Sequence, residues 1–155
     1  YLKAVNNKSN AFTPAINLYF ALEASLTMMQ KEGLNNIFTR HLRHQKATEE
    51  GIKAMGLNLF TKEGCGSPAI TAVQPENIDA ESIRKTIKND FDILLAGGQD
   101  HLKGKIFRIG HLGFVNDRDI LSVISALEST LNKMGKIKAP VGQGLAKAIT
   151  ALNNA

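Results

Sequence analysis

The chain has 155 residues, of which 43% are hydrophobic, and this is enough for one domain with a buried core. Its formal net charge is +5, but the 19 lysine and arginine residues are scattered, so the sequence lacks the basic footprint of a nucleic-acid-binding protein. The single cysteine, Cys65, excludes an intrachain disulfide and a cysteine-held iron–sulfur or zinc centre, and no apolar run is long enough to cross a bilayer. We therefore expect a soluble, cytoplasmic protein with no nucleic-acid or membrane partner.

The N-terminal segment is a polar lead-in, residues 1–13, that opens on Tyr1 instead of methionine. It has no start signal of its own, and it lacks the basic, apolar and small-residue order of a secretory signal. We expect the chain to be a piece cut from something longer.

Two helices are predicted in the first third of the chain. Apolar residues recur at spacings of three and four over 14–30, where Pro14 suits the first helical turn and Thr13 suits the cap. A second, less regular apolar side predicts a helix over about 33–55, which Gly56 ends.

Two more helices follow in the second half of the chain. The segment NIDAESIRKTIKNDF (77–91) predicts a helix that Asp79 caps at its start. Apolar residues follow helical spacing closely over 117–134, which predicts a helix that ends at Gly135. The remaining tail, 136–155, could form a short surface helix or fray.

Four short segments rich in apolar and β-branched residues predict strands, at 57–60, 69–73, 92–96 and 105–112. Strands and helices do not alternate regularly enough for a doubly wound parallel sheet. We therefore predict an α+β fold, in which helices pack on one face of a small, mainly antiparallel sheet.

The loop GGQDHLKGK (97–105) is not a phosphate-binding P-loop. Gly98 and Gly104 are separated by five residues where that motif has four, no serine or threonine follows Lys105, and the next predicted element is a strand. We expect these glycines to serve a sharp turn or the close approach of another backbone segment.

The histidines and the cysteine give weak signals for catalysis or metal binding. His41 and His44 are three apart on a predicted helix, but no carboxylate or cysteine matches them and RHLRH is basic, so we expect a solvated face. His101 and His111 flank the arginine of the last predicted strand, and we expect hydrogen-bonded structural residues there. Cys65 has no local support for a thiolate, so we expect an unreactive thiol.

Arg108 is the strongest candidate for a binding residue. Strand alternation places its side chain on the opposite side of the strand from Phe107 and Ile109. An arginine within an apolar strand must reach water or find an anion. The anion could be an internal carboxylate such as Asp92 or Asp100, or the carboxylate of a ligand held by two parallel hydrogen bonds. Composition leaves both alternatives open.

Several segments together carry a resemblance to a known family. They are FRIGHLG, preceded by LAGGQDHLKGK and followed by RDILSVISALESTL, with TPAINLYFALEASLTMMQKEGLNNIFTRH and GSPAITAV upstream. From about Phe12 to Met134 the chain resembles the C-terminal small domain of class V pyridoxal-phosphate aminotransferases of the serine–pyruvate and alanine–glyoxylate type. Some cyanobacterial members are called soluble hydrogenase subunits, although hydrogenases hold their metal centres through several cysteines.

The resemblance implies a role for two residues. The arginine of the RIG motif binds the substrate α-carboxylate in that family, which assigns this role to Arg108. The threonine of the TP segment, here Thr13, reaches the pyridoxal 5'-phosphate of the partner subunit in a homodimer. The family's Schiff-base lysine belongs to a large domain upstream of Tyr1, so no catalytic residue is expected in this chain and no metal is implied.

The resemblance also implies a division of the chain and an activity. Residues 1–13 would lead in from the missing large domain, 14–135 would form the small domain, and 136–155 would form a tail. The whole enzyme would move an amino group between serine or alanine and pyruvate or glyoxylate, whereas this chain alone would be inactive. Two alternatives are a non-catalytic accessory domain of a soluble hydrogenase and a small-carboxylate binding module.

Overall fold

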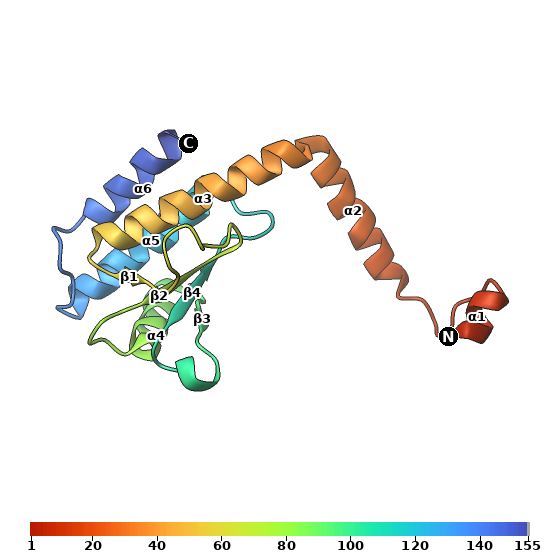
Figure 1. The fold of residues 1–155 in the computed structure, drawn as a ribbon, viewed down its shortest axis with the longest axis horizontal. Helices are drawn as coiled ribbons and strands as arrows, with labels where there is room; N and C mark the ends of the chain where they lie inside the picture. Colours follow the sequence, from red (N-terminus) through yellow and green to blue (C-terminus); the bar gives the residue numbers. More distant parts are fainter. Residues whose placement is uncertain (155) are drawn as a thin grey trace. The chain divides into compact units, whose positions relative to one another are not determined.

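The computed structural model of the chain describes residues 1–154 (Figure 1). Its elements, in chain order, are α1 (Leu2–Asn6), α2 (Ile16–Glu32), α3 (Leu34–Ala54), β1 (Asn58–Leu59), β2 (Ile70–Gln74), α4 (Ala80–Phe91), β3 (Ala96–Gly97), the 3₁₀ helix η1 (Asp100–Leu102), β4 (Phe107–Gly110), α5 (Asp117–Lys133) and α6 (Gln143–Asn153). The chain divides into two compact units, Tyr1–Phe38 and the residues from Thr39 onward. No helix in residues 1–154 combines the length and the hydropathy that a bilayer crossing requires.

The first unit contains α1, α2 and the start of α3, and its main helix begins later than predicted. Ala15 is the N-cap of α2, with ψ 74°, and no side chain caps the helix. The prediction that Thr13 caps this helix is therefore wrong. Because the backbone turns helical only after Ala15, Thr13 precedes the cap position and its hydroxyl is not used there. The helix ends at Gly33, whose φ of 85° favours glycine.

Helix α2 carries apolar side chains on all of its sides. The predicted face contains Tyr19 and Leu22, but Phe20 and Met28 point in other directions around the helix and are 64% and 48% exposed. None of the residues of α2 is buried in this chain. A helix that is apolar all round is typical of one that is buried in a larger protein.

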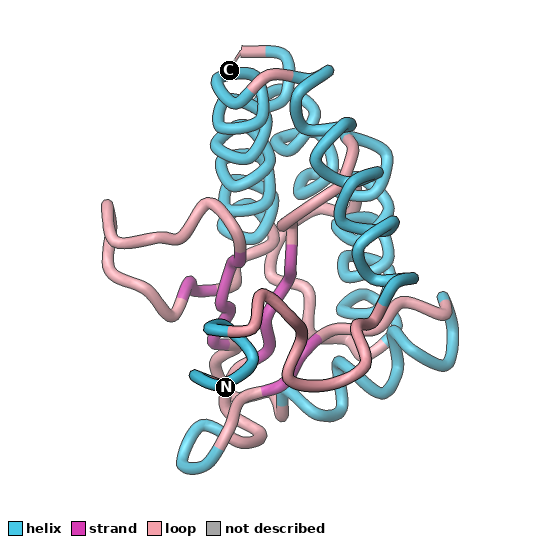
Figure 2. The backbone as a smooth tube through the Cα atoms, turned by 90° about the vertical axis from the view of Figure 1, so that its right-hand side faces the viewer, coloured by secondary structure: helices cyan, strands magenta, loops and turns pink. Residues whose placement is uncertain are grey.

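The second unit is built on a small antiparallel sheet with strand order β1-β2-β4-β3. Figure 2 shows its strands in magenta among the helices. Strand β4 lies between β2 and β3, so that Arg108 is paired with Ala72 on one side and with Ala96 on the other. Helix α4 contacts both β3 and β4 and packs against α5. This arrangement confirms the predicted α+β fold with its antiparallel sheet.

The predicted strand at 92–96 is mostly wrong. Residues 92–95 form no strand, and β3 contains only Ala96 and Gly97. The physical reason lies at the end of α4, where Asp92 adopts a left-handed conformation with φ 54° and closes the helix. The chain must leave this cap and turn toward the sheet before it can pair with β4.

One face of the sheet packs against the helices and forms one side of the hydrophobic core. Val73, Phe107 and Ile109 are buried on this face, as strand alternation predicts. The core residues of α4 and α5 that belong to the same cluster are Ile83, Ile87, Ile120, Val123, Ile124, Leu127 and Leu131. Each large aliphatic side chain removed from water contributes about 1.5–3 kcal/mol. The helices therefore hold β4 in place through its buried face and leave its other face for Arg108.

The C-terminal helix α6 packs against α5 through small residues. Gly144 is buried, and its backbone N–H donates a 2.9 Å hydrogen bond to an oxygen of Glu128 on α5. A Cβ at Gly144 would lie 2.6 Å from Cγ of Met55. Only glycine fits between Met55 and Glu128 here without a shift of a neighbouring side chain.

Candidate substrate-carboxylate site

Arg108 lies in the middle of β4, and its side chain is half-buried. Its neighbours Phe107 and Ile109 point into the core, so the arginine belongs to the opposite face of the sheet. Its Nε donates a 3.1 Å hydrogen bond to the backbone oxygen of Gly97 in β3. This bond uses the side of the guanidinium and leaves its two terminal nitrogens available.

Neither Asp92 nor Asp100 forms an ion pair with Arg108 in residues 1–154. Asp92 closes helix α4, and Asp100 begins the 3₁₀ helix η1 with φ 47°. The internal salt bridge that the sequence left open therefore has no counterpart among the described residues. A guanidinium with two free terminal nitrogens can bind a carboxylate through two parallel hydrogen bonds.

The loop after β3 confirms the expected role of its glycines. Gly98 donates a 3.0 Å backbone hydrogen bond to Ile106. A Cβ at Gly98 would lie 2.1 Å from the backbone oxygen of Leu102, so the loop folds back on itself at a distance that only glycine permits. The chain turns here through η1 and returns as β4, which places Gly97 beside Arg108.

His111 is a buried structural residue, as predicted. Its Nδ1 donates to the backbone oxygen of Pro68 at 2.9 Å, and its Nε2 then accepts from the hydroxyl of Thr71 at 2.9 Å. Burial lowers the pKa of His111, and the hydrogen bond to Pro68 opposes this change. His101 is exposed in η1 and makes no side-chain hydrogen bond within residues 1–154, so the prediction of a hydrogen-bonded residue is wrong there. Cys65 is exposed in a loop.

The predicted solvated face at His41 and His44 is wrong, because both side chains are buried. The Nε2 of His41 accepts a 3.2 Å hydrogen bond from the backbone N–H of Gly113. The Nε2 of His44 lies 2.9 Å from a carboxylate oxygen of Asp117. In residues 1–154 no group of three or more histidine, cysteine and acidic side chains could hold a metal ion.

Sequence reasoning missed Asp117, which joins α3 to the first turn of α5. Both terminal nitrogens of Arg43 donate to its carboxylate, at 2.6 and 3.0 Å. Burial would raise the pKa of Asp117, but the hydrogen bond from His44 and the positive charge of Arg43 hold it below the usual value. Asp117 is 73 residues from His44, so no local signal could have found this pair.

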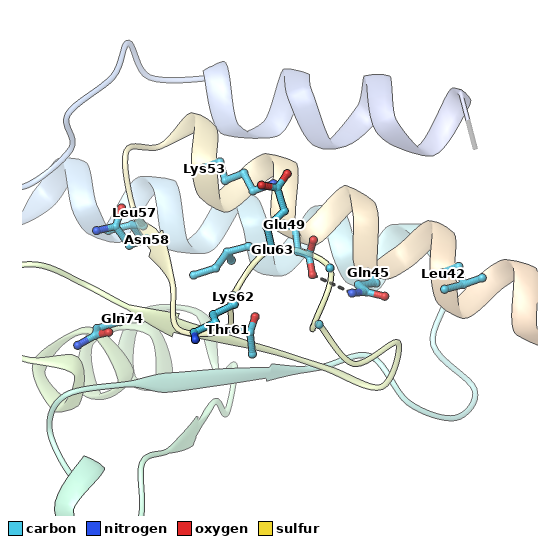
Figure 3. Close-up of a pocket in the computed structure, with 13 residues that line it drawn as sticks. Leu42, Gln45, Glu49, Lys53, Leu57, Asn58, Thr61, Lys62, Glu63 and Gln74 are labelled. Carbon is cyan, nitrogen blue, oxygen red and sulfur yellow. Dashed lines mark hydrogen bonds between the residues drawn. The ribbon is translucent and has the colours of Figure 1, made fainter.

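An open hollow of about 740 Å³ lies between α3 and the loop that follows β1 (Figure 3). Its lining is largely polar, and Nε2 of Gln45 donates to Glu49 within it at 2.8 Å. Neither Arg108 nor Thr13 lines it. The hollow is therefore separate from both predicted binding residues.

Thr13 is exposed in the first compact unit, whereas Arg108 belongs to the second. No side-chain hydrogen bond of Thr13 occurs within residues 1–154. Its hydroxyl is available to accept or donate a hydrogen bond. The two predicted binding residues are thus carried by separate units of the chain.

Comparison with known proteins places the chain among aminotransferases. No family model matches it. The chain is 53% identical, over 100% of its length, to a protein named soluble hydrogenase, small subunit, of Synechococcus sp. (strain PCC 6716). It is 38% identical, over 92% of its length, to serine–glyoxylate aminotransferase of Arabidopsis thaliana. It spans 40% and 36% of these two relatives.

The solved structures agree with the sequence comparison. Ureidoglycine–glyoxylate aminotransferase of Bacillus subtilis superposes on 99% of the chain with a TM-score of 0.90 and 33% identity, and the match covers 41% of that structure. The chain therefore belongs to the class V aminotransferase family and corresponds to a C-terminal part of its members.

Proposed function

We propose that the whole protein is a pyridoxal-phosphate-dependent aminotransferase. It moves an amino group between a small amino acid, serine or alanine, and a 2-oxo acid, pyruvate or glyoxylate. This chain supplies Arg108, which binds the substrate carboxylate, and part of the dimer surface. The names of the relatives support an amino donor and glyoxylate as acceptor.

The observation that carries this proposal is the state of the Arg108 side chain. It has a single hydrogen bond, to Gly97, and no carboxylate partner in residues 1–154. A half-buried guanidinium is costly to leave unpaired, whereas a substrate carboxylate would give it two charge-assisted hydrogen bonds. Such bonds are worth about 1.5–3 kcal/mol when one partner is charged.

The described residues fit only part of the requirement for pyridoxal 5'-phosphate. The exposed hydroxyl of Thr13 suits a phosphate oxygen, and Arg108 suits the carboxylate of the substrate. Every lysine of the chain is exposed, and none lies in an enclosed site that could position a Schiff base. We propose that the cofactor lysine lies elsewhere in the whole protein, as the family resemblance implies.

When bound, pyridoxal phosphate supplies the carrier for the amino group and the electron sink for proton removal. Arg108 contributes orientation. Two parallel hydrogen bonds fix the plane of the substrate carboxylate, and this limits rotation of the amino acid about its Cα–carboxylate bond. The arginine stays charged throughout and moves no proton.

The apolar surface of α2 supports a larger assembly. Leu18 and Phe20 are 70% and 64% exposed in this chain. Burial of such side chains against a large domain or a second subunit is the ordinary way to remove this surface from water. We propose a homodimer in which Thr13 reaches the cofactor phosphate of the partner subunit.

The division of the chain stays a prediction. We propose that residues 1–13 lead in from the large domain, that 14–135 form the small domain, and that 136–155 form the C-terminal tail. A cytoplasmic location of the whole protein is likewise a proposal, supported by the single cysteine.

The test uses the whole protein, purified with pyridoxal phosphate and supplied with L-alanine and glyoxylate. We expect pyruvate and glycine as products and an absorbance band of the bound cofactor. The Arg108→Ala variant should keep this band and lose most of its kcat/KM for alanine. A protein that binds no cofactor and moves no amino group would contradict the proposal and favour an accessory domain. Cofactor-free binding of small carboxylates would favour a binding module.

A further inference from the structure

Arg108 depends on a backbone oxygen for its orientation. The 3.1 Å bond from its Nε to Gly97 is the contact that fixes the rotation of the guanidinium. With Nε occupied, a carboxylate can use only the two terminal nitrogens, so it must approach the guanidinium end-on. A shift of the Gly97 oxygen would free Nε and allow other rotamers of the side chain.

Strand β3, which carries Gly97, has few hydrogen bonds to the rest of the sheet. Strand β3 has two residues and pairs only with β4. A second support comes from Arg84 on α4, whose Nε donates to the backbone oxygen of Leu95 at 2.8 Å. The residue just before β3 is thereby tied to the helix.

The same arginine also contacts Gly97. Nη1 of Arg84 donates to Glu81 one helical turn earlier, and the side chain of Arg84 is 25% exposed. A Cβ at Gly97 would lie 2.7 Å from Nη1 of Arg84 and 2.8 Å from Oε1 of Glu81. The Arg84–Glu81 pair therefore lies directly against the Cα of Gly97, and any larger residue there would displace one of the two.

The contacts of Gly97 come from opposite sides. Gly97 is paired with Phe107, which faces the core and the helices, whereas Ala96 is paired with Arg108 on the other face. The Arg84–Glu81 pair thus supports β3 from the helix side, and Arg108 uses the carbonyl that this support holds in place.

We propose that Arg84 and Glu81 are positioning residues for substrate carboxylate binding, acting through the Gly97 carbonyl on Arg108. The inference rests on the proposed function and adds to it. The pair touches no substrate. It fixes the oxygen that orients the guanidinium, so its loss should weaken binding of the amino acid without reaching the cofactor or the chemistry.

The experiment measures the whole protein loaded with pyridoxal phosphate, with L-alanine as the varied donor and glyoxylate at saturation. Arg84→Gln should raise the KM for alanine about tenfold, as loss of one charge-assisted hydrogen bond predicts, with kcat little changed. Melting temperature and cofactor absorbance should match those of the wild type. Glu81→Gln, which keeps the size of the side chain, should act in the same direction and serves if Arg84→Gln fails to fold.

The matched control is Lys53→Gln. Lys53 and Glu50 form an ion pair at the same spacing on α3, at 3.1 Å, and neither contacts β3 or Arg108 in residues 1–154. This variant should leave the KM for alanine unchanged. A similar rise of KM in the control would show a general effect of surface charge and would overturn the inference.

A double-mutant cycle separates positioning from a purely structural role. If Arg84 acts through Arg108, Arg84→Gln should have no further effect on kcat/KM in an Arg108→Ala background. Equal losses in both backgrounds, or an unchanged KM in Arg84→Gln where Arg108→Ala raises it, would overturn the inference and leave the proposed function intact. An Arg108→Ala variant with wild-type kinetics, or an inactive wild type, would overturn the proposed function and the inference together.

Discussion

Nε2 of His44 lies 2.9 Å from Oδ1 of Asp117, and this contact joins the middle of α3 to the first turn of α5. A carboxylate only accepts, so the histidine donates from Nε2 and its Nδ1 carries a lone pair. This Nδ1 is buried and has no hydrogen-bond partner in residues 1–154. A proton added there would be a buried donor with nothing to bind.

The structure predicts that stability decreases as the pH falls below neutrality. Burial lowers the pKa of His44, the hydrogen bond to Asp117 acts to raise it, and the positive charges of Arg43 and Arg40 lower it further. Burial also lowers the pKa of His111. Below the ordinary histidine value of about 6.5, the unfolded chain therefore binds more protons than the folded chain. The melting temperature of the whole protein should therefore be lower at about pH 5.5 than at about pH 7.5, measured by thermal melts followed by circular dichroism.

The control for this prediction is His44→Gln, which can still donate to Asp117 but takes up no proton. Its melting temperature should depend less on pH over the same interval. Asp117 does not contribute to the pH dependence between about pH 7.5 and 5.5. Because its pKa is lowered in the folded chain, its contribution to stability is complete above the ordinary pKa of aspartate and is lost only at a lower pH. An equal slope in variant and wild type would show that His44 is not the group that titrates.

Arg108→Lys tests the carboxylate site. A lysine keeps the charge but loses the planar pair of donors and the bond from Nε to Gly97. In the whole enzyme the KM for the amino acid should rise, and kcat/KM should fall by about 1.5–3 kcal/mol of transition-state stabilisation, while the fold stays intact. Steady-state kinetics with L-alanine measure this change. Unchanged kinetics together with a lower melting temperature would mean that Arg108 serves the fold.

Thr13→Ala tests the proposed contact with the cofactor phosphate. The hydroxyl is exposed and caps no helix in this chain, so its removal should cost little stability. Retention of pyridoxal phosphate by the dimer should nevertheless decrease, measured as the loss of cofactor absorbance on dialysis. Thr27→Ala removes another exposed hydroxyl from the same unit and should have no effect. Equal retention in all three proteins would remove the assignment of Thr13.

The isolated chain should fold but remain catalytically silent. Its second unit has a core of its own, whereas amino transfer needs a lysine poised on the cofactor. We expect cooperative thermal unfolding, no band of bound pyridoxal phosphate, and no conversion of alanine and glyoxylate. Turnover by a pure sample free of the parent enzyme would show that the chain holds a complete active site.

The isolated chain should also self-associate through α2. Phe20 is 64% exposed on this helix, and Phe20→Glu should shift the chain toward the monomer. Sedimentation at several concentrations measures the shift. Wild-type association in the variant would place the contact on another surface.

Local patterns predicted the parts of the fold whose determinants are close in sequence. The spacing of apolar residues on α5 matches the side that is buried, and Asp79 caps α4 by accepting from the backbone N–H of Ser82 at 2.9 Å, as predicted. Alternation along β4 correctly separated Arg108 from Phe107 and Ile109. In each case the residues that decide the structure lie close together in the sequence.

Contacts between distant segments were beyond local reasoning. RHLRH suggested a solvated surface, but Asp117 arrives from 73 residues away and makes the position of His44 buried and paired. Likewise, the family resemblance implied a role for Arg108, but only the tertiary structure shows that its Nε donates to the backbone oxygen of Gly97. The length of β3 also depends on where α4 ends, which strand propensity does not encode.

The two outer strands of the sheet, β1 and β3, are only two residues long. A long flat edge offers a row of unpaired N–H and C=O groups to another chain, and short edges offer few. Addition of strands from other chains at these edges is therefore disfavoured. When its apolar helix is left uncovered, the chain should form small assemblies through side chains and should resist conversion into fibrils.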